Sequence, residues 1–132
     1  MNVLVVALDA VTPADVRDAE VLVVAPALTS WLRRWLSDED AARRKAEGRA
    51  AAVVERLEIR GVHAEGRVGD SDPLLAIADV LPTFNADEIV IAAESEHSSR
   101  RTAELASRAR NRFGLPTGVN DLQHNDTRKE AA

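Results

Sequence analysis

Short apolar segments recur along this chain and predict β-strands. Three predicted strands consist almost wholly of Val, Leu, Ile and Ala, at residues 3–8, 21–25 and 88–93. Such continuous apolar runs are typical of strands covered on both faces of a parallel sheet. Residues 62–68 predict a weaker strand at a sheet edge, because Gly66 interrupts the run. A last short strand is predicted over residues 115–120.

Polar start signals predict helices between these strands. Thr12 followed by Pro13 and Asp15 has the pattern of a helix N-terminus, so a short helix is predicted between the first two strands. Ser37 with Asp40 forms a second start of the same kind. A third helix is predicted after the turn at residues 69–73, and a fourth is predicted to begin at Ser98 or Ser99.

Apolar stripes at spacings of three and four support the longer helices. The helix predicted from Ser37 to about Arg60 has the stripe Ala42, Ala46, Ala50, Val53 and Leu57. The third helix is predicted to point Leu74, Ile77, Leu81 and Phe84 inward, and the fourth Thr102, Leu105, Ala106, Ala109 and Phe113. Gly61 and Gly114 follow the second and fourth helices where a left-handed residue often ends a helix.

This alternation of strands and helices predicts an α/β fold. We expect an open, mostly parallel five-stranded sheet with helices on both faces. The length of 132 residues fits one domain. We expect that domain to span residues 1–120 and to be followed by a flexible tail at residues 121–132.

Composition and charge narrow the classes of function. The net charge of −5 disfavours nucleic-acid binding, which needs a basic face for the phosphate backbone. The absence of cysteine excludes disulfides, thiol nucleophiles and cysteine-based zinc sites. The apolar runs are all shorter than the roughly 20 residues that a membrane helix needs. We therefore expect a cytoplasmic protein with no nucleic-acid or membrane partner.

Three segments resemble the universal stress protein family. Leu8-Asp9 ends the first strand, Gly-Asp-Ser-Asp-Pro-Leu fills residues 69–74, and Ala-Asp-Glu-Ile-Val-Ile fills residues 86–91. The similarity extends over about Asn2 to Asn120, and residues 24–38 look most like actinobacterial members. The resemblance implies an adenine nucleotide alpha hydrolase-like fold, a role in stress response and a homodimer, which in this family often forms through the last strand.

One departure from the family pattern concerns ATP. The family's ATP-binding members have a loop of the form Gly-x-x-Gly, followed later by Gly-Ser or Gly-Thr, after the fourth strand. Glycine is needed because a Cβ would block the approach of backbone N–H groups to the phosphates. This chain has no glycine between Gly69 and Gly114, and it places Glu94 and Glu96 in that stretch. We expect no ATP binding of the family type and no cofactor.

The candidate binding cleft lies at the carboxyl ends of the strands, where open parallel sheets bind ligands. Its predicted residues are Asp9, Pro26, Asp70, Ser98, Ser99 and Arg100. The serines and arginines near the start of the fourth helix form either an anion site or a hydroxyl cap followed by solvated arginines. Trp31 and Trp35 either close an edge of the core or stack on a planar ligand or a partner.

Three functional hypotheses follow from these observations. The first is a non-enzymatic stress-response module that works by binding a protein partner or by self-association. The alternative is a binder of a nucleotide or small anion in the cleft. The third is a hydrolase that uses His97 as an acid or base.

Overall fold

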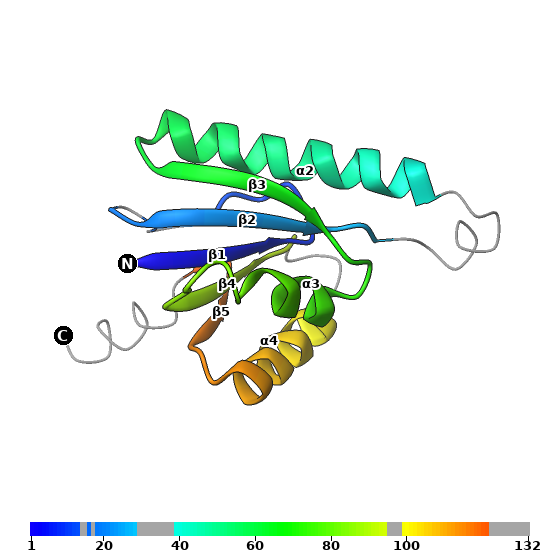
Figure 1. Cartoon of the computed structure of the whole chain (residues 1–132), viewed down its shortest axis with the longest axis vertical. Helices are drawn as coiled ribbons and strands as arrows, with labels where there is room; N and C mark the ends of the chain where they lie inside the picture. Colours follow the sequence, from blue (N-terminus) through cyan, green and yellow to red (C-terminus); the bar gives the residue numbers. More distant parts are fainter. Residues whose placement is uncertain (14–15, 17, 29–38, 95–98, 122–132) are drawn as a thin grey trace.

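A single parallel sheet forms the middle of the molecule (Figure 1). The computed structural model describes residues 1–13, 16, 18–28, 39–94 and 99–121. All adjacent strands are parallel and lie in the order β3-β2-β1-β4-β5. The five strands are β1 (Asn2–Ala7), β2 (Glu20–Pro26), β3 (His63–Gly69), β4 (Glu88–Ala92) and β5 (Thr117–Val119). The predicted open α/β sheet is confirmed, and its strands are wholly rather than mostly parallel.

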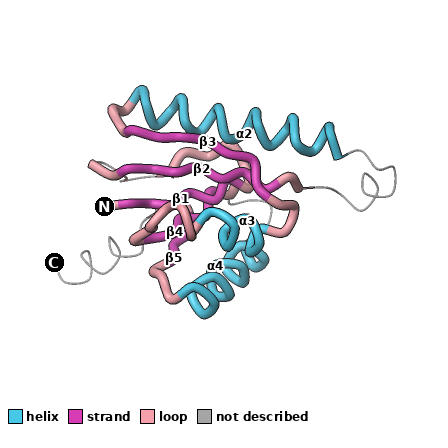
Figure 2. The backbone as a smooth tube through the Cα atoms, viewed as in Figure 1, coloured by secondary structure: helices cyan, strands magenta, loops and turns pink. Residues whose placement is uncertain are grey.

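Helices cover both faces of the sheet, as predicted (Figure 2). The long helix α2 (Glu39–Ile59) lies on one face, mainly over β2 and β3. The helices α3 (Pro73–Val80) and α4 (Ser99–Phe113) lie on the other face. The alternation of side chains along each strand divides the core into two layers. In β1, Val3 and Val5 point toward α2, while Leu4 and Val6 point toward α3 and α4.

The predicted stripe of α2 is buried along its whole length. The helix ends at Gly61, whose φ of +83° is the left-handed conformation expected there. The N–H of Gly61 donates to the carbonyl of Glu58 at 2.9 Å, and the N–H of Val62 donates to that of Leu57 at 2.9 Å. This pair of bonds is the Schellman motif, in which the last carbonyls of a helix find donors. Gly114, with φ +66°, ends α4 in the same conformation.

The helix predicted to start at Thr12 is wrong. The described residues between β1 and β2, which are 8–13, 16, 18 and 19, are not helical. The side-chain oxygen of Thr12 is buried without a hydrogen-bond partner among the described residues, so it caps nothing there. A six-residue strand advances about 20 Å, and a helix needs about 13 residues to return that far. Residues 8–19 are too few for such a helix and its turns.

Arginines of α2 bind the backbone of this connection instead. Arg56 Nη1 donates to the carbonyl of Ala10, and Arg60 Nη1 donates to that of Pro13 at 3.3 Å. Arg49 lies on the same side of α2, about two turns before Arg56 and three turns before Arg60. It donates to carbonyls where β1 and β2 end. We call Arg49, Arg56 and Arg60 the arginine row. The Arg60 bond is half-buried and supplies the donor that the carbonyl of Pro13 needs away from water. The Arg56 bond is exposed.

Both edges of the sheet agree with the sequence patterns. The weak strand broken by Gly66 is β3, and it lies at one edge. The short last strand is β5, which lies at the other edge and, within the described part of the chain, pairs only with β4. Among the described residues, no helix has both the length and the apolar character needed to span a bilayer. Trp31, Trp35, Ser37 and the tail from residue 122 onward lie outside the described residues.

Replacing Gly69 by Ala should destabilise the fold, because β3 approaches α3 closely there. A Cβ on Gly69 would lie 2.7 Å from Ala76 Cβ and 2.8 Å from Val24 Cγ2. Overpacking of this kind costs about 1–3 kcal/mol. We expect the free energy of unfolding, measured in urea, to fall by that amount.

The matched control is Gly48→Ala. Gly48 lies inside α2, and an added Cβ would meet nothing within 4 Å. Alanine is favoured over glycine in a helix by roughly 0.5–1 kcal/mol, so this variant should be more stable than the parent. A Gly69→Ala protein as stable as the parent would contradict the close contact between β3 and α3.

Candidate functional site

The direction of chain connections reverses between β1 and β4, which are neighbours in the sheet. The segment that leaves β1 packs into the α2 layer through Val11 and Val16. The segment that leaves β4 leads to α4, which lies on the opposite face. Such a reversal opens a crevice outside the carboxyl ends of the two strands, and open α/β sheets bind their ligands there.

Asp9 bridges this crevice. The N–H groups of Leu8 and Asp9 both donate to the carbonyl of Ala92, at 3.0 and 3.1 Å. The Asp9 carboxylate then accepts the N–H of Glu94, which lies 2.8 Å from its Oδ2. A carboxylate that accepts a backbone N–H forms one of the stronger protein hydrogen bonds. The first described residues after β4 are therefore held against the end of β1.

Asn120 closes the other side of the same strand end. It follows β5 in the left-handed conformation, with φ +59°, which Asn tolerates better than most residues. Its side-chain amide donates from Nδ2 to the carbonyl of Ala93 at 2.7 Å, and its Oδ1 accepts the N–H of Ala93 at 2.9 Å. Both backbone groups of Ala93 are thus bonded to one side chain.

Arg49 joins the ends of β1 and β2. Its Nε donates to the carbonyl of Ala7 at 3.2 Å, and its Nη2 donates to the carbonyl of Pro26. Burial lowers the pKa of the Arg49 guanidinium from its ordinary value, and the negative charge of Asp9 partly opposes that shift. The charged guanidinium is thus placed between the strand ends, near a carboxylate of opposite sign.

The acidic turn after β3 is organised around α3. Asp70 Oδ1 accepts the N–H of Asp72 at 2.9 Å, and Asp72 Oδ1 accepts the N–H of Leu74 at 3.0 Å. Asp72 is the N-cap of α3 and Pro73 is its first residue, a common pattern at helix starts. Asp70 therefore supports the turn, whereas the sequence pattern had placed it among the ligand-binding residues.

The structure brings only part of the predicted site together. Asp9 and Pro26 lie at the same edge of the sheet and are linked through Arg49. Arg100 is exposed at the start of α4, and among the described residues no hydrogen bond or ion pair joins it to Asp9. Ser99 begins α4, whereas Ser98 and His97 lie outside the described residues.

Two residues of this edge were not identified from the sequence. Arg49 stands three residues after Ala46 and four before Val53, at the border of the buried stripe of α2. A charged residue at such a border can bury its stem and keep a polar head at the end of the sheet. Asn120 directly follows the last strand, and an Asn after a strand is a common left-handed turn residue. The sequence thus contains a signal for Arg49 and one for Asn120, but neither signal predicts which backbone groups these side chains bond to.

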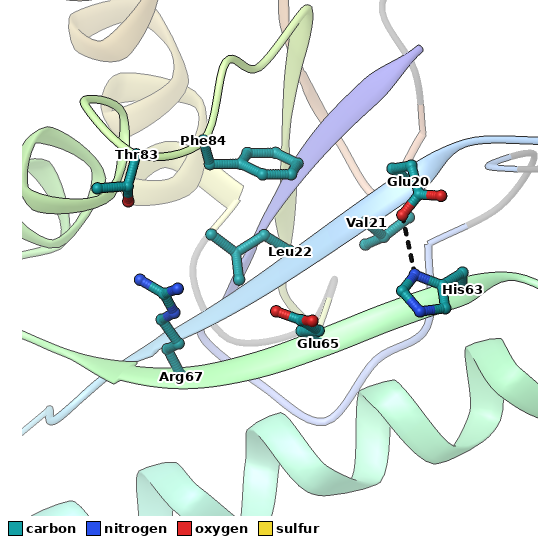
Figure 3. Close-up of a pocket in the computed structure, with 8 residues that line it drawn as sticks. All are labelled: Glu20, Val21, Leu22, His63, Glu65, Arg67, Thr83 and Phe84. Carbon is teal, nitrogen blue, oxygen red and sulfur yellow. Dashed lines mark hydrogen bonds and ion pairs between the residues drawn. The ribbon is translucent and has the colours of Figure 1, made fainter.

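A second hollow lies away from this edge, at the start of β2 and β3 (Figure 3). It has a volume of about 170 Å³ and is bounded in part by Leu22, Thr83 and Phe84. His63 Nδ1 lies 2.8 Å from Glu20 Oε2 at its rim, and both side chains are well exposed. Within the described part of the chain, no group of three or more His, Cys, Asp or Glu side chains is arranged to hold a metal ion.

Comparison of the sequence with protein-family models gives no match, and comparison with curated proteins gives none either. The resemblance to universal stress proteins therefore depends on the segments at residues 8–9, 69–74 and 86–91.

Replacing Arg49 by Met should destabilise the protein by about 2–4 kcal/mol. The variant keeps an unbranched apolar stem but leaves the carbonyls of Ala7 and Pro26 without their charged donor. Each hydrogen bond from a charged group contributes roughly 1.5–3 kcal/mol. The measurement is urea unfolding followed by circular dichroism.

Arg44→Met is the matched control, because Arg44 is an exposed residue of the same helix. Exposed substitutions of this kind usually change stability by less than about 0.5 kcal/mol. Equal, small losses in the two variants would show that Arg49 does not hold the strand ends.

Proposed function

We propose that this chain is a universal-stress-protein-like module that does not bind ATP and works by binding a protein partner or by self-association. The observation that supports this most is the bonding at the end of β4. Ala93 is bonded to the Asn120 amide, and the N–H of Glu94 is bonded to the Asp9 carboxylate. A loop that holds a triphosphate needs those backbone N–H groups free to face the phosphates.

The charges at this edge also oppose a triphosphate. Asp9 lies at this edge of the sheet, and Glu94 is exposed beside it. Two like charges about 4 Å apart repel by about 1 kcal/mol even in bulk water, and more strongly in a cleft. A phosphate would have to displace a carboxylate from its hydrogen bond while it approached that same negative charge.

The proposal includes a stress-response role in the cytoplasm, a homodimer, and no nucleic-acid partner. Its supports are the segments that resemble the family, the net charge of −5 and the absence of cysteine. The proposed module is non-enzymatic. It has no cofactor in its working form.

One observation favours a second candidate, the binding of a nucleotide or small anion at the same edge. Arg49 is held between the strand ends with two of its donor groups bonded to carbonyls. A guanidinium has five N–H donors, so, among the described residues, further donors of Arg49 remain for an anion that fits beside Asp9. In this candidate, the anion would be smaller than a triphosphate and would bind beside the Arg49 guanidinium.

A thermal melting series separates the two candidates. We expect the melting temperature to be unchanged by millimolar MgATP, because its phosphates find no free backbone donors. A ligand at 100 times its Kd would add about 2.7 kcal/mol of stability, which a melting curve detects easily. The same series includes AMP and inorganic phosphate.

A saturable rise with MgATP would contradict the proposed function. A rise with phosphate or AMP alone, lost in Arg49→Lys, would instead support the anion-binding candidate. Arg44→Lys provides the control for the substitution, since Arg44 is exposed on the same helix.

A further inference from the structure

The outer side of β3 is an open sheet edge. Among the described residues, β3 pairs with β2 alone, and α2 covers only one of its faces. Ala64 and Val68 point toward α2 and pack against its core layer. Glu65 and Arg67 project from the opposite face, on the side of Leu22 (Figure 3). An open edge presents unpaired backbone groups that can bond to another strand.

Charged side chains usually protect such edges from pairing, but here the two charges are opposite and symmetrically placed. Glu65 and Arg67 flank Gly66 on either side and are both exposed. If a second copy of β3 lay antiparallel with Gly66 opposite Gly66, each Glu65 would face Arg67 of the second copy. Opposite charges directly across two antiparallel strands are stabilising, and like charges are destabilising.

The two neighbouring registers lack this complementarity. An axis at Glu65 would place the two Glu65 side chains opposite each other, and an axis at Arg67 would do the same for the two arginines. The axis at Gly66 also places Ala64 opposite Val68 on the other face, so small apolar side chains meet beneath α2. Of these three registers, the charge pattern selects the one with its axis at Gly66.

The helix beside the edge is also placed to meet its copy near Gly66. A Cβ on Gly66 would lie 3.3 Å from Ala50 Cβ and 3.3 Å from Val54 Cγ2, so the middle of α2 lies level with Gly66. An open groove of about 610 Å³ runs between α2 and β3, and its apolar part includes Ala51 and Val68. Small residues along a helix allow a second helix to approach closely.

Two charges of α2 extend this match. Arg43 lines one end of the groove, and Glu58 lies on the same side of α2, one turn beyond Val54. They stand equally far from the Ala50–Ala51 pair in opposite directions. An antiparallel α2 with its axis near that pair would bring Arg43 toward Glu58 of the second copy at both ends.

We propose that the chain forms a homodimer in which β3 pairs antiparallel with β3 of a second copy about a two-fold axis at Gly66. The dimer would have one continuous sheet, with the two α2 helices side by side on the same face. This rests on the self-association part of the proposed function and names the surface that carries it. The opposite edge offers less backbone for pairing with a second strand, because β5 has only three residues and ends at exposed Val119.

Charge reversal tests the register directly. Glu65→Arg alone places two arginines opposite each other at both pairs, and Arg67→Glu alone places two glutamates there. We expect each variant to dimerise at least roughly 10-fold more weakly than the parent, as measured by sedimentation equilibrium. An equimolar mixture of the two variants restores both Glu–Arg pairs, so it should form a heterodimer with a Kd within about threefold of the parent.

Glu104→Arg and Arg108→Glu provide the matched control. They make the same charge changes on exposed residues of α4. This helix packs against β5, at the edge of the sheet opposite β3. Neither variant, nor their mixture, should change the Kd of the dimer. If this control mixture associated as strongly as the β3 mixture, the attraction would be one of net charge, and the proposed register would be overturned.

Val119→Asp distinguishes the two edges of the sheet. Loss of the dimer in this variant, with the β3 variants unaffected, would overturn the β3 interface and leave the self-association part of the proposed function standing. A chain that stays monomeric at about 100 μM would overturn both the β3 interface and the self-association part of the proposed function. The proposal on ATP would survive either result, because the melting series tests it separately.

Discussion

The shortness of the connection between β1 and β2 is the constraint on which this structure depends. Residues 8–19 must run back from the end of β1 to the start of the parallel strand β2, and their described residues do so without a helix. Two of their carbonyls, those of Ala10 and Pro13, accept hydrogen bonds from Arg56 and Arg60 of α2. The position of α2 on the sheet is thus linked to the path of this connection, and Arg49 extends the same link to the ends of β1 and β2.

This arrangement changes what the ligand-binding edge of the fold can do. In an open parallel sheet, the crevice beyond the strand ends normally offers free backbone donors to a ligand. Here Asp9 and Asn120 bond to the backbone after β4, and Arg49 bonds to the ends of β1 and β2. We therefore propose that binding moves from this crevice to the open β3 edge, where opposite charges flank Gly66 in a self-complementary order.

The sequence predicted the fold better than the site, for a physical reason. Apolar runs and the α2 stripe report burial, and burial determines which segments become strands and which helix faces turn inward. The helix-start pattern at Thr12 is a local signal. It failed because residues 8–19 are too few to form a helix with its turns and still run back the length of a strand. Asp9 was found because it ends a strand, whereas Arg49 and Asn120 act on carbonyls that are distant along the chain.

The backbone amides of Ala93 and Glu94 report most directly whether the protein itself fills the strand-end site. We predict by NMR that both amides exchange slowly with solvent, because side-chain oxygens of Asn120 and Asp9 accept them. Adding MgATP should leave their chemical shifts and exchange rates unchanged. Rapid exchange that becomes slow when MgATP is added would show that these donors are free for phosphate, and it would contradict the account.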